Sequence, residues 1–441
     1  MRDDKTSARE MRGRLNAFQR SMLQWNAMHP YNAVHVARMP GTPDQSRLQQ
    51  AIRRVLDGRS LSSLTLDPGK ATFCYRGGPA DCEINDLGGG TSPGDLISAE
   101  MERQLNTPFR LDAPFSPFRF FTTRWNDSFA LGISYLHLVA DAESIVLLLK
   151  DIVENYRGIQ EPPPREPCGT GDPRQSVLPA QLAAYARKLA AFPSSIADMR
   201  CSFRPPSAKA KDMHNRLMLF TLGPGSLQGL VATAKSWGIT LNDLLLALLM
   251  KSCALLATGR EKAKRRTKLS VGCIVNTRRD HGIERRGVFG LFLGSFIITH
   301  AVPRQTALRE LGQDIGRLTL EIKRKKLYLA TPLELCFGQF MLSFYSTERR
   351  EKLYPKHYPL WGGLTNMNIN KLWGPPESEA PLDYVRAVCT GPATPVVLSF
   401  TTVREAANIG LSYRSGVFSA ADADRLADCL LGQIAELEVR A

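Results

Sequence analysis

The chain has 441 residues, of which 43% are hydrophobic and 22% charged, and its formal net charge is +15. These proportions are those of a globular protein, and no run approaches the ~18–20 consecutive apolar residues of a membrane span, so we expect none. The length exceeds that of one ordinary core and favours two domains or lobes of about 200 residues each.

The N-terminus, the cysteines and the charge bear on the environment of the protein. The first ten residues are polar and lack the apolar core of a signal peptide, which favours a cytoplasmic protein. The nine cysteines are scattered and form no CxxC pair, so we expect reduced, buried thiols. The positive charge implies an anionic partner, and nucleic acid, a membrane surface, a phosphate-bearing cofactor and an acidic protein all meet that description.

Hydrophobic periodicity predicts alternating helices and strands in the first third of the chain. We expect helices at 15–25, 48–55 and 94–105, and strands at 32–39, 61–66, 72–75 and 115–124. The last of these strands has the position of a hairpin partner for the strand that follows it.

Residues 128–150 carry the most informative constellation. Apolar residues alternate along a strand that ends in His137, and a helical apolar pattern begins after Asp141. His137 is therefore expected on a loop at the end of a strand, between rigid neighbours. From such a position a scaffold can present an imidazole to a cleft.

Prolines and glycines gather between residues 157 and 206, around one predicted helix at 180–191. This segment is the best linker candidate in the chain. It divides the sequence into an N-terminal lobe at 1–157, a crossover linker at 158–212 and a C-terminal lobe at 213–441.

The second half repeats the alternation of elements. We expect strands at 216–222, 269–276, 288–302, 395–403 and 409–413, helices at 227–237 and 308–326, a terminal helix from 419, and a loop at 361–368. Asn242 and Asp243 are expected to cap a long buried helix that runs to residue 256.

Together these residues resemble the superfamily of condensation domains and coenzyme A-dependent acyltransferases. It includes nonribosomal-peptide condensation domains, wax ester synthases, polyketide-associated acyltransferases and chloramphenicol acetyltransferase. Its central motif is HHxxxDG, or HxxxD in many branches, and Leu136-His137-Leu-Val-Ala-Asp141-Ala142 is similar to it, with leucine for the first histidine and alanine for the glycine. Further elements match, in the family's order, at 15–22, 30–32, 237–247, 275–278, 290–295 and 364–368.

The resemblance implies an α/β fold of two chloramphenicol-acetyltransferase-like lobes, each a mixed β-sheet with flanking helices. The pair would be pseudo-dimeric, with a central channel that His137 faces. The implied activity is acyl transfer from acyl-coenzyme A or an acyl or peptidyl carrier protein to a small amine or alcohol, in secondary metabolism or lipid biosynthesis. The thioester of coenzyme A or phosphopantetheine would be a co-substrate, and no tightly bound cofactor and no metal are expected. The protein looks free-standing.

Within this resemblance His137 is the general base, which takes the proton of the attacking acceptor. Asp141 pairs with Arg278 of the other lobe and so supports the histidine loop. A simple N-cap role would also explain an aspartate at this position, because its carboxylate accepts hydrogen bonds from first-turn amides.

The late segment supplies candidates for substrate contacts. Thr365, Asn366 and Asn368 could donate to the oxyanion of the tetrahedral intermediate or to a donor arm, and an asparagine-rich turn explains them equally well. Trp361 could line the acyl or acceptor tunnel, although large aromatic residues are more often found in a core.

Four basic runs, at 260–268, 285–286, 323–326 and 349–350, lie in the C-terminal half. Each is by default a solvated face, but together they would attract the phosphates of coenzyme A or the acidic face of a carrier protein. Two hypotheses are alternatives to an enzymatic function. One is a catalytically silent condensation-like protein that binds carrier proteins. The other is a basic nucleic-acid-binding protein, but the sequence contains no helix-turn-helix, zinc or RNA-reading motif that would support it.

Overall fold

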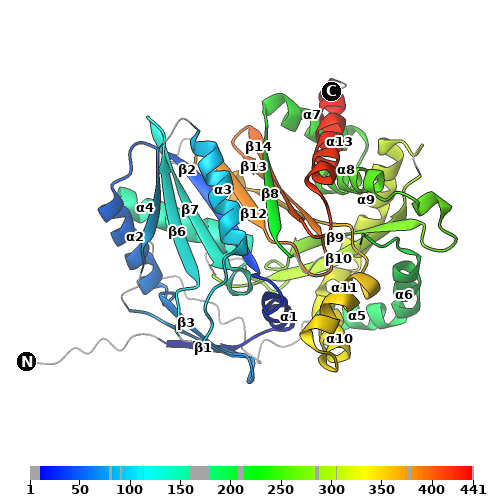
Figure 1. Cartoon of the computed structure of the whole chain (residues 1–441), viewed down its shortest axis with the longest axis horizontal. Helices are drawn as coiled ribbons and strands as arrows, with labels where there is room; N and C mark the ends of the chain where they lie inside the picture. The colour runs from blue at the N-terminus through cyan, green and yellow to red at the C-terminus, as the bar shows by residue number, and fades with distance from the viewer. Residues whose placement is uncertain are drawn as a thin grey trace, which may run out of the picture.

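The computed structural model describes residues 10–78, 82–89, 92–112, 114–158, 179–206, 213–283, 288–303, 305–374 and 380–439. Sheets of five and six strands form two lobes that lie side by side (Figure 1). Two parts of the predicted linker, 159–178 and 207–212, lie outside the described residues. The boundaries drawn from the sequence therefore stay predictions.

The N-terminal sheet has the strand order β12-β2-β7-β6-β5. Its strands are β2 (Asn32–Pro40), β5 (Ile84–Gly89), β6 (Phe118–Arg124), β7 (Ser128–Leu136) and β12 (Asp383–Val388). β5 and β6 are parallel and the other pairs are antiparallel, so the sheet is mixed. The central strand β7 is buried along its whole length, which explains its nearly continuous apolar sequence.

Helices cover both faces of this sheet (Figure 1). α2 (Gln45–Gly58) and α4 (Ala142–Arg157) pack on one face, and α3 (Pro93–Asn106) covers the other, toward the second lobe. α1 (Ala17–Asn26) begins with a capping box between Asn16 and Gln19. A small antiparallel sheet of β1 (Glu10–Arg14), β3 (Ser63–Asp67) and β4 (Thr72–Arg76) completes the lobe.

The C-terminal sheet has the strand order β10-β9-β11-β13-β14-β8. Its strands are β8 (Asn215–Leu222), β9 (Lys268–Asn276), β10 (Leu293–Ala301), β11 (Gly362–Asn368), β13 (Val396–Val403) and β14 (Ala406–Arg414). β11 is parallel to both neighbours and the other pairs are antiparallel. The predicted α/β fold of two lobes with mixed sheets is thus confirmed.

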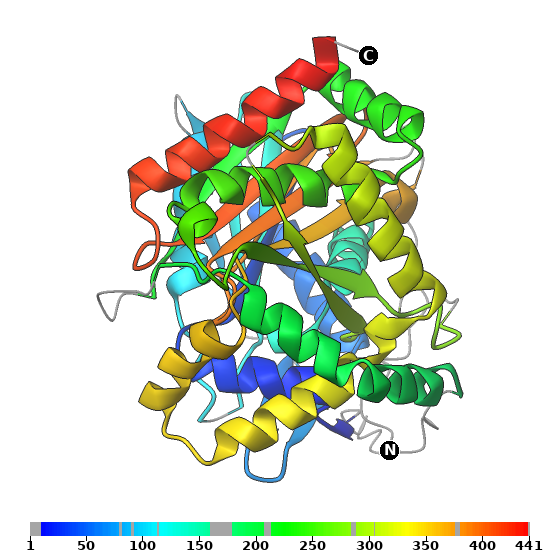
Figure 2. The same ribbon diagram turned by 90° about the vertical axis from the view of Figure 1, so that its right-hand side faces the viewer.

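Helices α7 (Pro224–Ser236), α8 (Leu241–Leu256), α9 (Leu308–Arg324) and α13 (Ala420–Val439) cover the outer side of this sheet (Figure 2). Below them lie α5 (Pro179–Ala190), α6 (Phe192–Cys201), α10 (Thr331–Ser343) and α11 (Thr347–His357), and α12 (Asn370–Trp373) follows β11. The N-cap of α8 is Thr240, in a capping box with Asp243, rather than Asn242. No single helix among the described residues is long and apolar enough to cross a membrane; the bent pair α7 and α8 meets that test only jointly.

Strand β12 joins the two lobes. It comes from the C-terminal part of the chain, yet it extends the N-terminal sheet by pairing with β2. Its backbone also lies against β14, because a Cβ added to Gly410 would stand 2.3 Å from the carbonyl oxygen of Arg386. An approach this close requires glycine. A segment that chain position assigns to the second lobe therefore belongs to the first sheet, where its backbone finds hydrogen-bond partners.

Residues 362–368, expected as a loop, form strand β11 in the middle of the C-terminal sheet. Glycine and asparagine are depleted in strands, which is why the sequence favoured a loop. Here Gly362 lies under α8, and a Cβ on it would stand 3.3 Å from Leu249. Glycine in this strand marks a close approach of a helix rather than a turn.

Candidate active site

His137 follows the last residue of β7 and opens a short 3₁₀ turn, His137–Val139, that leads into α4. Its backbone N–H donates to the carbonyl of Tyr31, at 3.0 Å. The imidazole stacks on the Tyr31 ring, with centroids 5.6 Å apart, and meets the Tyr135 ring edge-on at 5.8 Å. The residue is 9% exposed, so these rings and the turn fix the orientation of the imidazole.

The surroundings of the His137 ring favour one neutral tautomer. Nδ1 lies 3.4 Å from the carbonyl oxygen of Ala140. A carbonyl oxygen only accepts hydrogen bonds, so Nδ1 carries the proton and the lone pair is on Nε2. Burial lowers the pKa of His137 below its usual value, and the hydrogen bond to Ala140 opposes this shift only in part. The ring is therefore a neutral base at pH 7.

Asp141 has two structural roles at once. It is the N-cap of α4, where its carboxylate accepts the N–H of Ser144 at 2.8 Å. Nη2 of Arg278 donates to both carboxylate oxygens at 2.9 Å, and the N–H of Phe292 donates at 3.0 Å. Arg278 follows β9, so this ion pair, with side chains only 2% and 5% exposed, joins the two lobes. The two explanations that the sequence left open for Asp141 are not exclusive.

Ser144 completes this junction and was missed in the sequence. Its hydroxyl oxygen accepts hydrogen bonds from Arg278 Nη2 at 2.7 Å and from the N–H of Gly290 at 3.0 Å. It also lies 2.8 Å from the Gly290 carbonyl, to which the hydroxyl donates. A serine in the first turn of a helix is unremarkable in a sequence, so only its position relative to Asp141 could have drawn attention to it.

Arg386 on β12 is the second residue that the sequence did not reveal. It is 1% exposed and donates to Thr365 Oγ1 at 3.0 Å, to the Thr365 carbonyl at 2.8 Å, to the Phe400 carbonyl at 2.9 Å and to Thr401 Oγ1 at 2.9 Å. Burial lowers its pKa to about 10, which still leaves it charged at pH 7. Arginines are rarely buried completely, so composition gave no hint of it.

The predicted substrate contacts on β11 are not equivalent. The Thr365 hydroxyl and carbonyl both face Arg386 and accept its hydrogen bonds. Asn366 and Asn368 lie on the other face of the strand, since side chains alternate. Asn366 is exposed, whereas Oδ1 of Asn368 is buried and has no hydrogen-bond partner among the described residues. Of the candidates on this strand, Asn368 alone has an unused buried polar atom.

Trp361 lies in the hydrophobic core of the C-terminal lobe. It is 1% exposed, its ring stacks on Phe203 and its indole N–H donates to the Phe203 carbonyl at 2.9 Å. The indole has neither an exposed face nor a free donor for a ligand. This corrects the expectation of a substrate contact, and the core explanation holds because a tryptophan of this size is best accommodated there.

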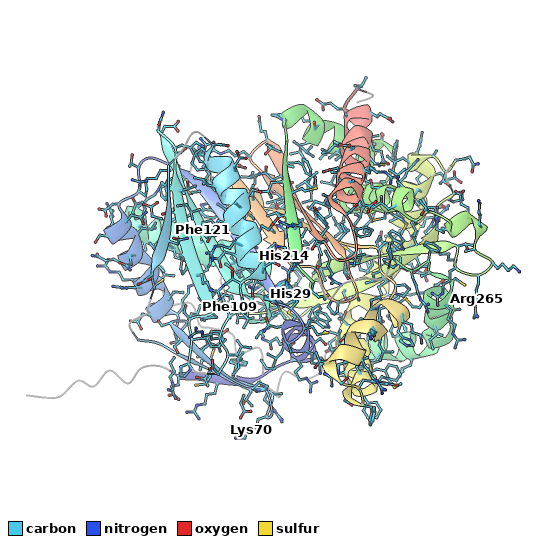
Figure 3. All side chains as sticks on the ribbon, in the orientation of Figure 1. His29, Lys70, Phe109, Phe121, His214 and Arg265 are labelled. Atoms are coloured by element: carbon cyan, nitrogen blue, oxygen red, sulfur yellow. The ribbon has the colours of Figure 1, made fainter. Side chains whose placement is uncertain are left out.

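The basic runs are partly used within the protein. Lys326 pairs with Asp280 at 2.7 Å and Lys325 with Glu321 at 2.5 Å. Lys262, Lys264 and Arg265 are exposed, and Figure 3 places Arg265 at the outer edge of the C-terminal lobe, away from the centre where His29 and His214 lie. Residues 285–286 lie outside the described residues.

Comparison with known proteins identifies the family. The model of the Condensation domain family matches residues 13–334, which is more than half of the chain. The chain belongs to the condensation-domain family. The predicted membership is confirmed, and the match includes His137, Asp141 and Arg278. No curated protein matches the sequence significantly.

Solved structures share the fold of this condensation domain. The condensation domain of the Monacolin K polyketide synthase MokA is 12% identical, with a TM-score of 0.68 over 98% of each chain. The first condensation domain of the calcium-dependent antibiotic synthetase, in complex with a substrate analogue, is 17% identical, with a TM-score of 0.66 over 97% of each chain. The epimerization domain from the third module of tyrocidine synthetase B is 15% identical, with a TM-score of 0.65 over 100% of this chain and 99% of that domain. Condensation and epimerization domains share this fold, so the fold does not choose the reaction.

Proposed function

We propose that this condensation domain is an acyltransferase that moves an acyl group from a thioester to an amine or alcohol. The observation that carries the proposal is the state of His137, a buried neutral imidazole with its Nδ1–H on Ala140 and its lone pair on Nε2. A general base must be unprotonated at working pH and held in one orientation, and this ring meets both conditions.

In the proposed reaction the acceptor nitrogen or oxygen forms a bond to the thioester carbonyl carbon while Nε2 of His137 takes its proton. The carbon–sulfur bond of the tetrahedral intermediate then breaks, and the imidazolium returns the proton to the departing thiolate. No covalent bond to the protein forms. Such a base contributes on the order of 10² to 10⁴ in rate.

The proposed role of Asp141 is to hold the turn that carries His137. Its carboxylate already accepts from Arg278, Ser144 and Phe292. A carboxylate with these donors is fixed in place and is a poor candidate for proton transfer. Because Arg278 comes from the other lobe, the pair would couple the geometry of the base to the contact between the lobes.

The proposed donors are acyl-coenzyme A and acyl or peptidyl carrier proteins, which present the same phosphopantetheinyl thioester. The similar structures include domains of a polyketide synthase and of an antibiotic synthetase, which supports a thioester donor. The exposed cations Lys262, Lys264 and Arg265 are suited to an anionic donor through long-range attraction. The acceptor is left as the class of small amines and alcohols.

The test is a thioester-consumption screen with acyl-coenzyme A and acyl-carrier donors against pooled amines and alcohols. It compares the wild type with His137→Ala and with the matched control His357→Ala, which removes an exposed histidine on α11. We expect transfer by the wild type and the control, and a loss of ~10² or more in His137→Ala. Undiminished transfer in His137→Ala would remove His137 from the chemistry.

One observation favours a second candidate, the silent carrier-binding protein. His137 is 9% exposed beneath Tyr31 and Tyr135, and Leu136, which stands where the family motif has its first histidine, is fully buried. A site closed in this way would bind a carrier without reacting. Tight carrier binding with no transfer from any donor in the screen would support this candidate against the enzyme.

A further inference from the structure

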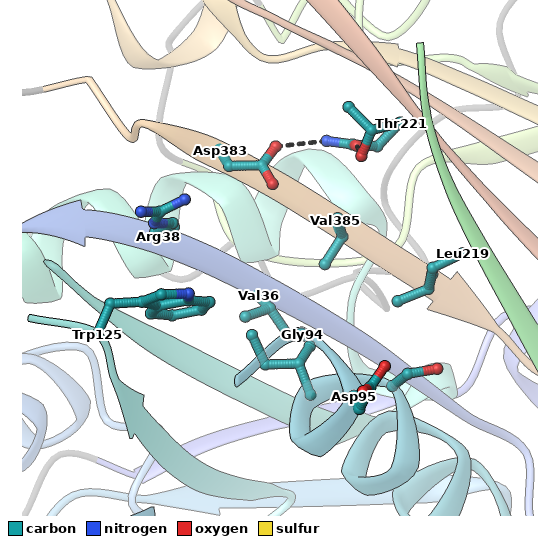
Figure 4. A pocket seen from close by; sticks show the side chains of 12 residues that line it. Val36, Arg38, Gly94, Asp95, Trp125, Leu219, Thr221, Asp383 and Val385 are labelled. Carbon is teal, nitrogen blue, oxygen red and sulfur yellow. Dashed lines mark hydrogen bonds between the residues drawn. The ribbon is translucent and has the colours of Figure 1, made fainter. Parts of the chain in front are cut away.

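A cavity of about 310 Å³ lies between the lobes, away from His137. Its walls come from β2 and β12 of the N-terminal sheet, from α3, and from β8 and β14 of the C-terminal sheet (Figure 4). Val36 and Arg38 of β2 face it, so His35, which precedes Val36, faces the opposite side of the sheet. His35 there contacts Tyr135, which in turn contacts His137. The sheet thus separates this cavity from the candidate active site.

A fixed cation lines one side of the cavity. The guanidinium of Arg38 lies over the ring of Trp125, 4.6 Å from its centroid, and its Nε donates to the Ser128 hydroxyl at 3.0 Å. Its Nη2 is 3.9 Å from the exposed carboxylate of Asp127. Nη1 donates no hydrogen bond within the described ranges, and Figure 4 shows the guanidinium at the cavity wall beside Trp125. The site therefore offers oriented donors to an anionic group.

A carboxylate lines the wall beside this cation. Asp383 on β12 is the direct cross-strand partner of Arg38 on β2, yet the two side chains form no ion pair in the described structure. Oδ1 of Asp383 instead accepts from Asn408 Nδ2 at 2.5 Å and from the Tyr384 N–H at 2.8 Å. The dashed line in Figure 4 marks the hydrogen bond from Asn408 to Asp383. Oppositely charged neighbours that turn apart leave room for a ligand that bridges them.

The other residues that line the cavity indicate the size, polarity and net charge of a ligand. The apolar side chains of Val36, Leu219 and Val385 lie between the charged groups in Figure 4, and Ile97 also lines the cavity. The volume is at the lower end of the ~300–1,000 Å³ of small-molecule sites. Arg38 is opposed by Asp383 and by the exposed Asp95, so an isolated anion would meet net negative charge. An isolated cation would leave Nη1 of Arg38 without an acceptor, because Asp127 lies near Nη2 only.

We propose that this cavity binds a small aliphatic zwitterion of the amino-acid type. The carboxylate of the ligand accepts hydrogen bonds from Arg38, its ammonium group lies against Asp383, and its aliphatic part covers Val36 and Val385. Leu219 of β8 belongs to the same apolar surface, so the bound molecule also contacts the C-terminal lobe. The proposal is independent of acyl transfer, because it uses the face of the sheet opposite to His35.

Isothermal titration of the full chain tests this with two zwitterionic probes, L-leucine and 6-aminohexanoate. 4-Methylpentanoate and 3-methylbutylamine are leucine without its ammonium and without its carboxylate. We expect saturable binding of at least one zwitterion, and affinities at least ~10-fold weaker for both single-charge analogues. Arg38→Gln and Asp383→Asn should each weaken the binding by ~10-fold or more.

Controls separate this site from the rest of the molecule. Arg124→Gln and Asp112→Asn remove charges outside the cavity and should leave the affinity unchanged. His137→Ala should also bind normally; if it does not, the probe occupies the candidate active site and the proposal is wrong. Thr221→Trp obstructs the exposed rim and should abolish binding even if a charge variant folds poorly. No saturation of either zwitterion by ~10 mM, or equal binding of 4-methylpentanoate, overturns the proposal.

Discussion

Asp141 and His137 belong to the same short segment, yet their surroundings differ in a way that assigns them different work. The carboxylate of Asp141 accepts from Arg278, Ser144 and Phe292, and is nearly inaccessible. Within the described ranges the imidazole of His137 uses only Nδ1, in a long contact with Ala140, and its pKa is lowered by burial. A side chain whose hydrogen bonds are all used holds structure, whereas one with an unused lone pair is available for chemistry.

The largest expected effect is the loss of turnover when His137, the side chain with the unused lone pair, is replaced. His137→Gln keeps a polar side chain of similar length but removes the basic nitrogen. Turnover should fall by ~10² to 10⁴, because proton transfer in the transition state is lost. The unfolding free energy should change by only about 1 kcal/mol, since Asp141 and its donors remain. Steady-state kinetics and urea unfolding measure the two quantities. A large loss of stability with normal turnover would show that His137 has a structural role and not a catalytic one.

The opposite pattern, a loss of stability, is expected at Asp141, whose hydrogen bonds are all used. Asp141→Asn removes the buried counter-charge of Arg278 and leaves only Glu143, 3.7 Å from its Nε, which should reduce the unfolding free energy by about 3 kcal/mol. Arg278→Met added to Asp141→Asn should cost much less than its own separate effect, because both act on one pair. Asp127→Asn, at a carboxylate 84% exposed, is the control and should stay within ~0.5 kcal/mol of the wild type. Additive losses would show that the ion pair is not a unit.

The contact of β12 with β14 extends the comparison to a second structural junction between the lobes. Gly410→Ala places a Cβ against the Arg386 carbonyl oxygen and should destabilise the protein by ~1–3 kcal/mol through overpacking. Gly432→Ala, in the middle of α13 with no heavy atom within 4 Å of the added Cβ, should instead stabilise it by ~0.5–1 kcal/mol. Thermal unfolding compares the two, and equal effects would mean that β12 is not packed this closely.

The smallest effect is on the pH dependence of stability. Burial lowers the pKa values of both His35 and His137 in the folded protein, so the unfolded chain binds more protons below its ordinary histidine pKa of ~6.5. Stability should therefore fall as pH decreases below ~6.5, by up to about 1.4 kcal/mol per pH unit for each neutral histidine. His137→Gln should reduce this slope in denaturant titrations from pH 7 to pH 5. An unchanged slope would mean that His137 is not held neutral.

The sequence predicted the elements whose patterns are local. The apolar run of β7 and the helical spacing after Asp141 located His137 at a strand end, and the order of motifs predicted two lobes with mixed sheets. The contact of Asp141 with Arg278, 137 positions along the chain, came only from the family resemblance. No local pattern encodes a partner at that distance.

The parts that the sequence did not predict depend on contacts between distant elements. The sequence of β11 resembles a loop because it contains the glycine that allows α8 to approach the strand. β12 joins the N-terminal sheet because it pairs with the edge of β2. Arg386 is buried among carbonyl and hydroxyl acceptors that two strands, β11 and β13, bring together. Trp361 belongs to the core for the same reason, since Phe203 reaches it only in the folded chain.

The most direct test of the central claim needs no substrate. Nitrogen-15 NMR of the His137 ring, assigned with His137→Gln, reports which ring nitrogen carries the proton and how the ring titrates. We predict a neutral ring at pH 7 with hydrogen on Nδ1, a free lone pair on Nε2, and a pKa below ~6.5. A protonated ring at pH 7, or hydrogen on Nε2 in the neutral form, would contradict the role of His137 as the base.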